Sequence, residues 1–177
     1  MRIPFVLLFA ATLLTSPLAH AGSDPCKGIK SHADKFGVTT RGTIVNLDVG
    51  GYTKLALIEE NGVATLQAMT VQRGGSDTPL PAGHPAKFAL GGGVLELTSR
   101  EASEAVLNAT DSTVFTQWLL KFDVDAATMS RLAGAAVEAV QFEVLGNKHE
   151  LPVKKAAGKK ILATAACLAA TPPAPKD

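Results

Sequence analysis

The sequence predicts an α+β domain, mainly an antiparallel sheet built from hairpins, with an N-terminal helix, a short central helix and a C-terminal helix. Short runs rich in Val, Ile, Leu and Thr recur between residues 39 and 98 and are separated by glycine-containing turns. Because most links between these runs are short, antiparallel pairing is favoured over a doubly wound parallel sheet. The composition, 46% hydrophobic and 19% charged, excludes an intrinsically disordered chain.

Residues 1–21 have the pattern of a cleaved secretory signal peptide. Arg2 supplies the positive charge, an apolar run continues to Leu14, and Ala19 and Ala21 offer the small side chains that signal peptidase accepts. The apolar run is shorter than the roughly 20 residues needed to span a bilayer, so a membrane anchor is the weaker interpretation. We therefore expect a soluble, exported product, located in the periplasm or outside the cell, with no membrane span in the mature chain.

The two cysteines, Cys26 and Cys167, predict a disulfide bond. In an oxidising compartment an even pair is more often bridged than free. Their wide spacing excludes a CxxC redox motif, and no further Cys or His stands at a spacing suited to zinc. We expect a single globular domain at residues 22–170, closed by this bridge between its first and last helices, and a disordered tail at residues 171–177.

The N-terminal helix is predicted directly after the signal peptide. Ser23 or Asp24 can cap it, Pro25 suits its first position and Gly37 can end it. Its apolar positions recur at helical spacing on one face, and they are Cys26, Ile29, Ala33 and Phe36.

Residues 39–98 predict a series of hairpins. Asn61-Gly62, between two strand-like runs, is the strongest short hairpin signal in the chain. The expected strands are residues 39–47, 52–59, 63–72, 86–90 and 94–98. Residues 73–85 contain three glycines and three prolines without apolar periodicity, and therefore predict a long loop. Such loops are usually functional or mobile, and mobility is the favoured interpretation.

The clearest core strand is residues 114–124, where Trp118 and Phe122 share the apolar face. Asp125 follows as the expected cap of the central helix. The remaining elements are a helix at 126–133, strands at 137–145 and 149–153, and a helix at about 155–170.

Motifs for catalysis, cofactors and metals are absent from the sequence. His149-Glu150 begins like a zinc-protease motif, but Val153 occupies the position of the second histidine. Asp123 and Asp125 lack the other ligands and the glycine of a calcium loop. No glycine-rich segment has the spacing of a phosphate or dinucleotide loop. We therefore expect no metal, cofactor or catalytic residue.

Five lysines form the one local charge asymmetry, since a net charge of +1 provides no large overall field. They lie within residues 148–160 and are Lys148, Lys154, Lys155, Lys159 and Lys160. Lysines in the first turn of a helix oppose its dipole, and such an arrangement is one sign of an anion-binding patch. A solvated surface is the commoner explanation and the favoured interpretation. Aromatic residues do not interleave with them, so we expect no nucleic-acid partner.

These observations predict a non-catalytic binding or structural-interaction domain, whose partner is an anionic ligand or a protein. One alternative is a small exported hydrolase in which Ser76, Asp77 and His84 converge from the 73–85 loop. Another is a periplasmic chaperone or inhibitor of an exported protein, which needs an exposed apolar patch or an open sheet edge.

Overall fold

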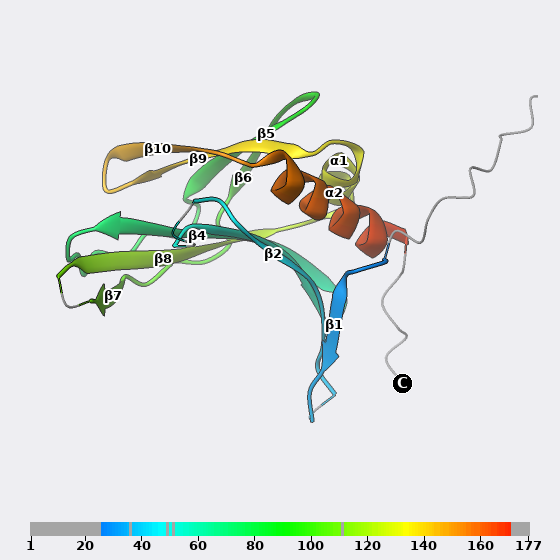
Figure 1. Ribbon diagram of the computed structural model, residues 1–177, viewed down its shortest axis with the longest axis horizontal. Coiled ribbons are helices and arrows are strands. Elements are labelled where there is room, and N and C mark those ends of the chain that lie inside the picture. Colours follow the sequence, from blue (N-terminus) through cyan, green and yellow to red (C-terminus); the bar gives the residue numbers. More distant parts are fainter. Residues whose placement is uncertain (1–25, 36, 49, 51, 111, 171–177) are drawn as a thin grey trace, which may run out of the picture.

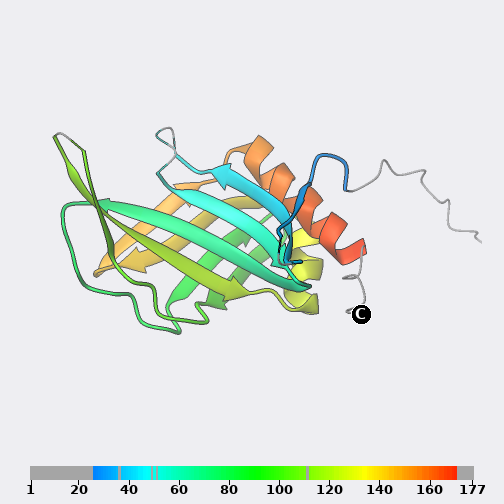
Figure 2. The ribbon, with the colours of Figure 1, turned by 90° about the horizontal axis from the view of Figure 1, so that it is seen from below.

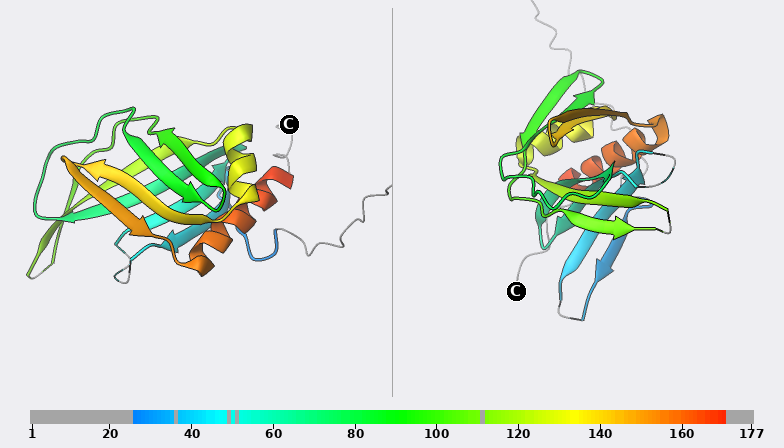
Figure 3. Two further views of the ribbon diagram at one scale, coloured as in Figure 1. Left: turned by 90° about the horizontal axis from the view of Figure 1, so that it is seen from above. Right: turned by 90° about the vertical axis from the view of Figure 1, so that its left-hand side faces the viewer.

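Two antiparallel sheets face each other, and two helices cover one end of the pair (Figure 1). This computed structural model describes residues 26–35, 37–48, 50, 52–110 and 112–170. The six-stranded sheet has the order β1-β2-β3-β4-β8-β7, and the four-stranded sheet has the order β10-β9-β5-β6. Figure 2 views the six-stranded sheet, and the left view of Figure 3 shows the four-stranded sheet beside the helices.

The strands of the six-stranded sheet are β1 (Lys30–Ala33), β2 (Thr39–Asn46), β3 (Lys54–Glu60), β4 (Val63–Arg73), β7 (Val106–Ala109) and β8 (Val114–Asp123). Those of the four-stranded sheet are β5 (Pro85–Leu90), β6 (Gly93–Thr98), β9 (Val137–Val144) and β10 (Asn147–Pro152). The helices are α1 (Ala126–Gly134) and α2 (Lys155–Ala170). Every neighbouring pair of strands is antiparallel.

The hydrophobic core lies between the two sheets. Alternate residues of β8 point inward, as the pleat requires, so Trp118 and Phe122 are buried while Lys121 lies on the other face. Phe88 of β5 meets Phe122 edge to face, with ring centroids 5.5 Å apart. This contact joins the two sheets, and such aromatic pairs add about 0.5–1.5 kcal/mol beyond the burial of their area.

Helix α2 closes one end of the core because it contacts β2 and β3 of one sheet and β9 of the other. Ile161, Ala165 and Leu168 form its buried stripe. Gly158 lies where α2 approaches β9, and a Cβ atom at this position would overlap the carbonyl oxygen of Val137. Glycine costs about 1 kcal/mol relative to alanine inside a helix. Here its missing side chain permits the close approach.

Most of the predicted elements are confirmed. The antiparallel hairpins lie within one or two residues of their predicted bounds, α2 begins and ends as expected, and Asp125 caps α1 by accepting a 2.7 Å hydrogen bond from the Thr128 backbone N–H. That bond lowers the pKa of Asp125. Residues 1–25 and 171–177, which hold the predicted signal peptide and tail, lie outside the described residues. No helix in the described residues is long and apolar enough to cross a membrane.

The predicted N-terminal helix is wrong for the part of it that is described. Residues 26–28 form a turn and Lys30–Ala33 form β1, which pairs with β2 from Lys30 opposite Gly42 to Ala33 opposite Thr39. Gly28, inside the predicted helix, has a positive φ, which a continuous helix does not allow. Four apolar positions at helical spacing are a weak preference, and pairing with β2 overrides it.

Strand β7 was not predicted because its sequence carries no alternation. All four of its residues are exposed, so neither face is selected for apolar side chains. Register with β8, from Val106 opposite Gln117 to Ala109 opposite Val114, determines its conformation.

Candidate functional site

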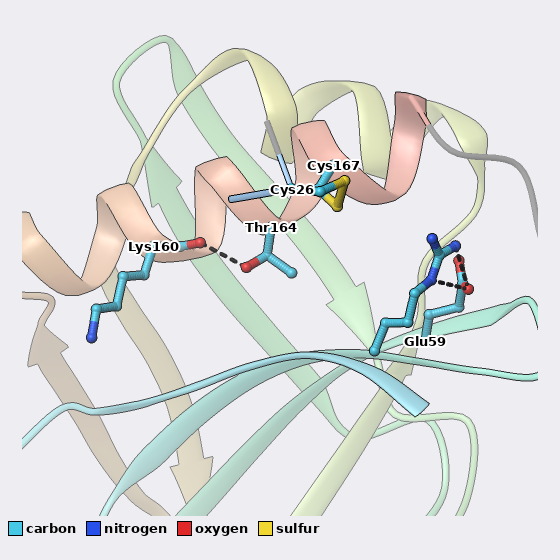
Figure 4. Close-up of a disulfide and its surroundings, with 6 residues drawn as sticks. Cys26, Glu59, Lys160, Thr164 and Cys167 are labelled. Carbon is cyan, nitrogen blue, oxygen red and sulfur yellow. Dashed lines mark hydrogen bonds and ion pairs between the residues drawn. A yellow bond between two sulfur atoms is a disulfide. The ribbon is translucent and has the colours of Figure 1, made fainter. Parts of the chain in front are cut away.

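The predicted disulfide joins Cys26 to Cys167 and attaches the start of the described chain to α2 (Figure 4). The S–S distance is 2.05 Å and the two Cα atoms are 4.7 Å apart. Cys167 is buried, so the bridge fixes the turn at residues 26–28 against the side of α2. It connects α2 to this turn, and not to an N-terminal helix as the sequence analysis expected.

A groove of about 620 Å³ lies beside this bridge, bounded by the N-terminal segment, the edge of the six-stranded sheet and α2. We call it the β1–α2 groove. Its lining residues are Lys27, Gly28, Ile29, Lys30, His32, Thr40, Gly42, Thr43, Ile44, Ile58, Lys160 and Ala163. Its volume falls within the range of about 300–1,000 Å³ usual for small-molecule sites.

Gly42 lies in the wall of the groove. The register places it between Lys30 of β1 and Ile58 of β3. A Cβ atom at residue 42 would overlap the carbonyl oxygen of Leu57, so β2 and β3 pack together here only with glycine. Glycine at residue 42 therefore permits the close packing of β2 and β3 beside the groove.

The electrostatics of the groove are one-sided. Lys27, Lys30 and Lys160 line it, and no acidic side chain does. Every salt bridge found among the described residues involves other lysines or arginines. Lys160 extends from α2 toward the sheet, on the same helix as Cys167 (Figure 4). Among the described residues these three lysines have no salt-bridge partner, so the electrostatic potential in the groove is positive.

The five lysines of the predicted anion-binding patch are separated by the fold. Lys148 lies on β10 directly opposite Glu143, and only Lys160 lines the β1–α2 groove. Lys154, Lys155 and Lys159 are exposed elsewhere near the start of α2. Adjacent helical residues differ by about 100° in direction, which explains why Lys159 does not share the environment of Lys160.

Lys27 and Lys30 were not predicted from the sequence as partners of Lys160. One signal was available: Lys160 and Cys167 are seven residues apart, which places them on the same helix face two turns apart. A bridge from Cys26 to Cys167 therefore brings the residues after Cys26 against the face that carries Lys160. Lys27 and Lys30 can be placed beside Lys160 in this way only if the two cysteines are paired and residues 26–33 are not helical.

The residues of the hydrolase alternative do not meet. The His84 ring Nε2–H donates to the carbonyl oxygen of Glu143, whereas Ser76 Oγ accepts from the backbone N–H of Thr78 at 3.2 Å. Neither side chain is hydrogen-bonded to the other or to Asp77, all three being described residues. A nucleophile and its base must lie within hydrogen-bond reach, and this pair does not.

The loop that carries these residues is anchored to the framework. Ser76 N–H donates to Thr116 Oγ1 at 2.8 Å, the Trp118 indole N–H donates to the Thr78 carbonyl at 3.1 Å, and Leu80 exchanges backbone bonds with Ser103. These bonds argue against the interpretation of residues 73–85 as a mobile loop.

Neither metal-ligating side chains of the described residues nor similarity to known proteins points to a second functional site. The described residues contain no cluster of three or more His, Cys, Asp or Glu side chains arranged to hold a metal ion. No protein-family model, curated protein or solved structure matches the chain. The geometry of the β1–α2 groove is therefore the main ground for a functional hypothesis.

Proposed function

We propose that this protein is an exported, non-catalytic binding module that holds an anionic ligand in the β1–α2 groove. The observation that carries the proposal is the convergence of Lys27, Lys30 and Lys160, brought together from opposite ends of the chain in a groove without an acidic side chain. Gathering three like charges is unfavourable in itself, and an anion relieves that repulsion.

The covalent closure of the groove supports the same proposal. The Cys26–Cys167 bridge fixes one wall, and pairing of β1 with β2 fixes the floor, so the backbone that carries Lys27 and Lys30 is held beside α2 before a ligand arrives. Preorganisation of this kind reduces the conformational entropy that the protein loses when a ligand binds. Stable disulfides are typical of oxidising compartments, which agrees with the predicted export.

Titration calorimetry with phosphate, sulfate and carboxylates of increasing chain length tests the proposal. We expect the triple variant Lys27→Gln, Lys30→Gln, Lys160→Gln to bind the tightest of these anions at least about tenfold more weakly, a loss of about 1.4 kcal/mol. The matched control replaces the exposed Lys148, Lys155 and Lys159 by Gln and removes the same formal charge.

The outcomes separate three explanations. Weakening only in the groove variant supports the proposed site. Weakening only in the control variant assigns anion binding to the surface near the start of α2 and rejects the groove. Equal weakening of anion binding in both variants attributes the loss of affinity to the lower overall charge, and it also rejects the groove as the binding site.

The edge strand β7 supports a second candidate function, chaperone-like binding of an unfolded exported protein. Val106 and Leu107 are 52% and 56% exposed, and β7 leaves one edge of its sheet open. Exposed apolar edges are templates for strand pairing. If this function is correct, the protein suppresses light scattering by a heat-aggregating client, and Leu107→Lys abolishes the suppression. Equal suppression by Leu107→Lys would rule β7 out.

A further inference from the structure

We infer that the ligand of the β1–α2 groove is a single-chain anionic amphiphile, with its acidic head at the lysines and its alkyl chain on the isoleucines of the groove. This inference rests on the proposed function, and it adds the chemical class of the ligand. It follows from the division of the groove lining into cationic and apolar side chains.

The cationic side chains of the lining, Lys27, Lys30 and Lys160, are the groups that can hold an acidic head. Lysine is a compact point charge on a flexible stem, so these ammonium groups can follow a carboxylate, sulfate or phosphate without the fixed fork geometry of arginine. Thr40 and Thr43 add uncharged hydroxyl donors to the lining. These groups bind a negative head and do not discriminate strongly among its forms.

The large apolar side chains of the lining, Ile29, Ile44 and Ile58, are the groups that can hold an alkyl chain. Ile44 is 62% exposed, the largest exposed fraction among the large hydrophobic side chains of the described residues, although it lies in a strand that is paired with β3. Ile29 and Ile58 are half-buried beside it. An alkyl chain laid on these side chains removes apolar surface from water on both partners, and each buried methylene contributes to affinity.

The free edge of β2 is too short to favour a peptide strand. Leu47 N–H donates to the Thr53 carbonyl, so the backbone groups of Leu47 point toward β3. In an antiparallel pair every second residue points its backbone N–H and C=O toward the partner strand. The backbone groups of residues 43 and 45 therefore point toward β3, and those of residues 44 and 46 point outward. β1 begins at Lys30, opposite Gly42, and covers β2 only from there to Thr39. Only two outward residues of β2 remain for strand addition, whereas the cationic and apolar lining continues onto α2.

The size of the groove favours one monomeric chain over a bilayer. A volume of about 620 Å³ is a compact site between a helix and a sheet edge. Membrane-binding surfaces instead present an apolar face with surrounding cations to an extended lipid plane. The source we commit to is therefore a free monomeric amphiphile.

The test is a calorimetric series of sodium butyrate, hexanoate, octanoate and decanoate at concentrations below micelle formation. We expect the dissociation constant to fall about fourfold for each added methylene until the groove is filled. The alkyltrimethylammonium ion with the same chain as decanoate is the charge control and should bind at least about tenfold more weakly than decanoate. Anionic phospholipid vesicles are the membrane control and should not bind.

The matched variants are Ile44→Ala and Val94→Ala. Both residues are more than half exposed, and Val94 lies on β6 of the other sheet, so neither variant should unfold the protein. Thermal melting verifies this. We expect Ile44→Ala to weaken decanoate about fivefold or more while it leaves butyrate unchanged, and we expect Val94→Ala to change neither.

The results distinguish failure of this inference from failure of the proposed function. Anion binding that depends on the three lysines but not on chain length overturns the inference of an amphiphilic ligand and leaves the proposed anion-binding function intact. Anion binding that is indifferent to the three lysines, or absent, overturns both. Equal affinity for the cationic amphiphile, or binding to vesicles without binding to monomers, overturns the inference that the ligand is a free anionic amphiphile.

Discussion

Removal of the Cys26–Cys167 bridge should destabilise the protein strongly, and Cys26→Ser is the best way to remove it. Cys26 is half-buried and precedes β1, whereas Cys167 is 1% exposed in the packed face of α2. Replacing Cys26 therefore breaks the bond without a cavity in the core. The separation of 141 residues makes the closed loop almost as long as the described chain.

The size of this effect follows from the loop. For a separation of 141 residues, the chain-entropy model gives a stabilisation of about 5 kcal/mol at 25 °C. Removal of a native disulfide from a small secreted domain typically costs about 2–5 kcal/mol, so we expect the free energy of unfolding to fall within that interval. At about 2–4 °C per kcal/mol, the melting temperature should fall by about 4–20 °C.

Urea denaturation of the oxidised wild type, the reduced wild type and Cys26→Ser provides the assay. If the bridge acts mainly by compacting the unfolded chain, both samples without it should show a larger m-value, because more surface becomes exposed on unfolding. A loss of less than about 1 kcal/mol in both samples would refute the loop argument. Agreement between reduced wild type and Cys26→Ser controls for effects of the new serine.

The same variant tests the groove. Without the bridge, the turn that carries Lys27 and Ile29 is no longer attached to α2, although β1 remains paired with β2. We expect Cys26→Ser to weaken decanoate binding about tenfold or more at a temperature where the variant is folded. Unchanged affinity would show that the wall formed by residues 27–29 contributes nothing to binding.

Three further perturbations test the fold. Gly158→Ala should lower the free energy of unfolding, measured by urea denaturation, because the added methyl group overpacks against Val137 at a cost of about 1–3 kcal/mol. The higher helix propensity of alanine offsets about 1 kcal/mol of this loss. Phe122→Ala should cost about 3–5 kcal/mol in the same assay, because its fully buried ring joins the two sheets. The pKa of Asp125 is lowered in the folded state by the backbone N–H of Thr128, so its stabilising contribution is present above the unfolded value, about 3.9, and is lost as the pH falls through the lower folded value. Asp125→Ala should therefore be less stable than wild type near neutral pH, and the difference should narrow at pH values below about 4.

Each of these perturbations has a control. Gly134→Ala places a methyl group at the end of α1 with no atom within 4 Å, so it should not destabilise, and equal losses at both glycines would contradict the close-contact argument. Val94→Ala is the exposed counterpart of Phe122→Ala. Asp125→Asn keeps the capping oxygen without the charge and should retain most of the stability at every pH. A gap between Asp125→Ala and wild type that is constant with pH would contradict the contribution assigned to the carboxylate charge.

The sequence by itself determined the elements whose signals are local. α2 spans residues 155–170 because a buried stripe recurs at helical spacing, and β8 follows from strict alternation around Trp118 and Phe122. Asp125 was identifiable as a cap because capping requires one side chain at one position. The two cysteines could be paired because no alternative partner exists in the sequence.

The tertiary structure alone decided the arrangement of these elements and the site. Residues 30–33 have helical apolar spacing but become β1 because β2 offers backbone partners, and β7 forms beside β8 without any pattern of its own. The division of the strands into two sheets depends on pairings between distant residues, which local periodicity does not encode. The β1–α2 groove arises for the same reason: Lys27 and Lys160 become neighbours through a covalent bridge across the chain, and charge attracts a ligand according to distance in space rather than distance in sequence.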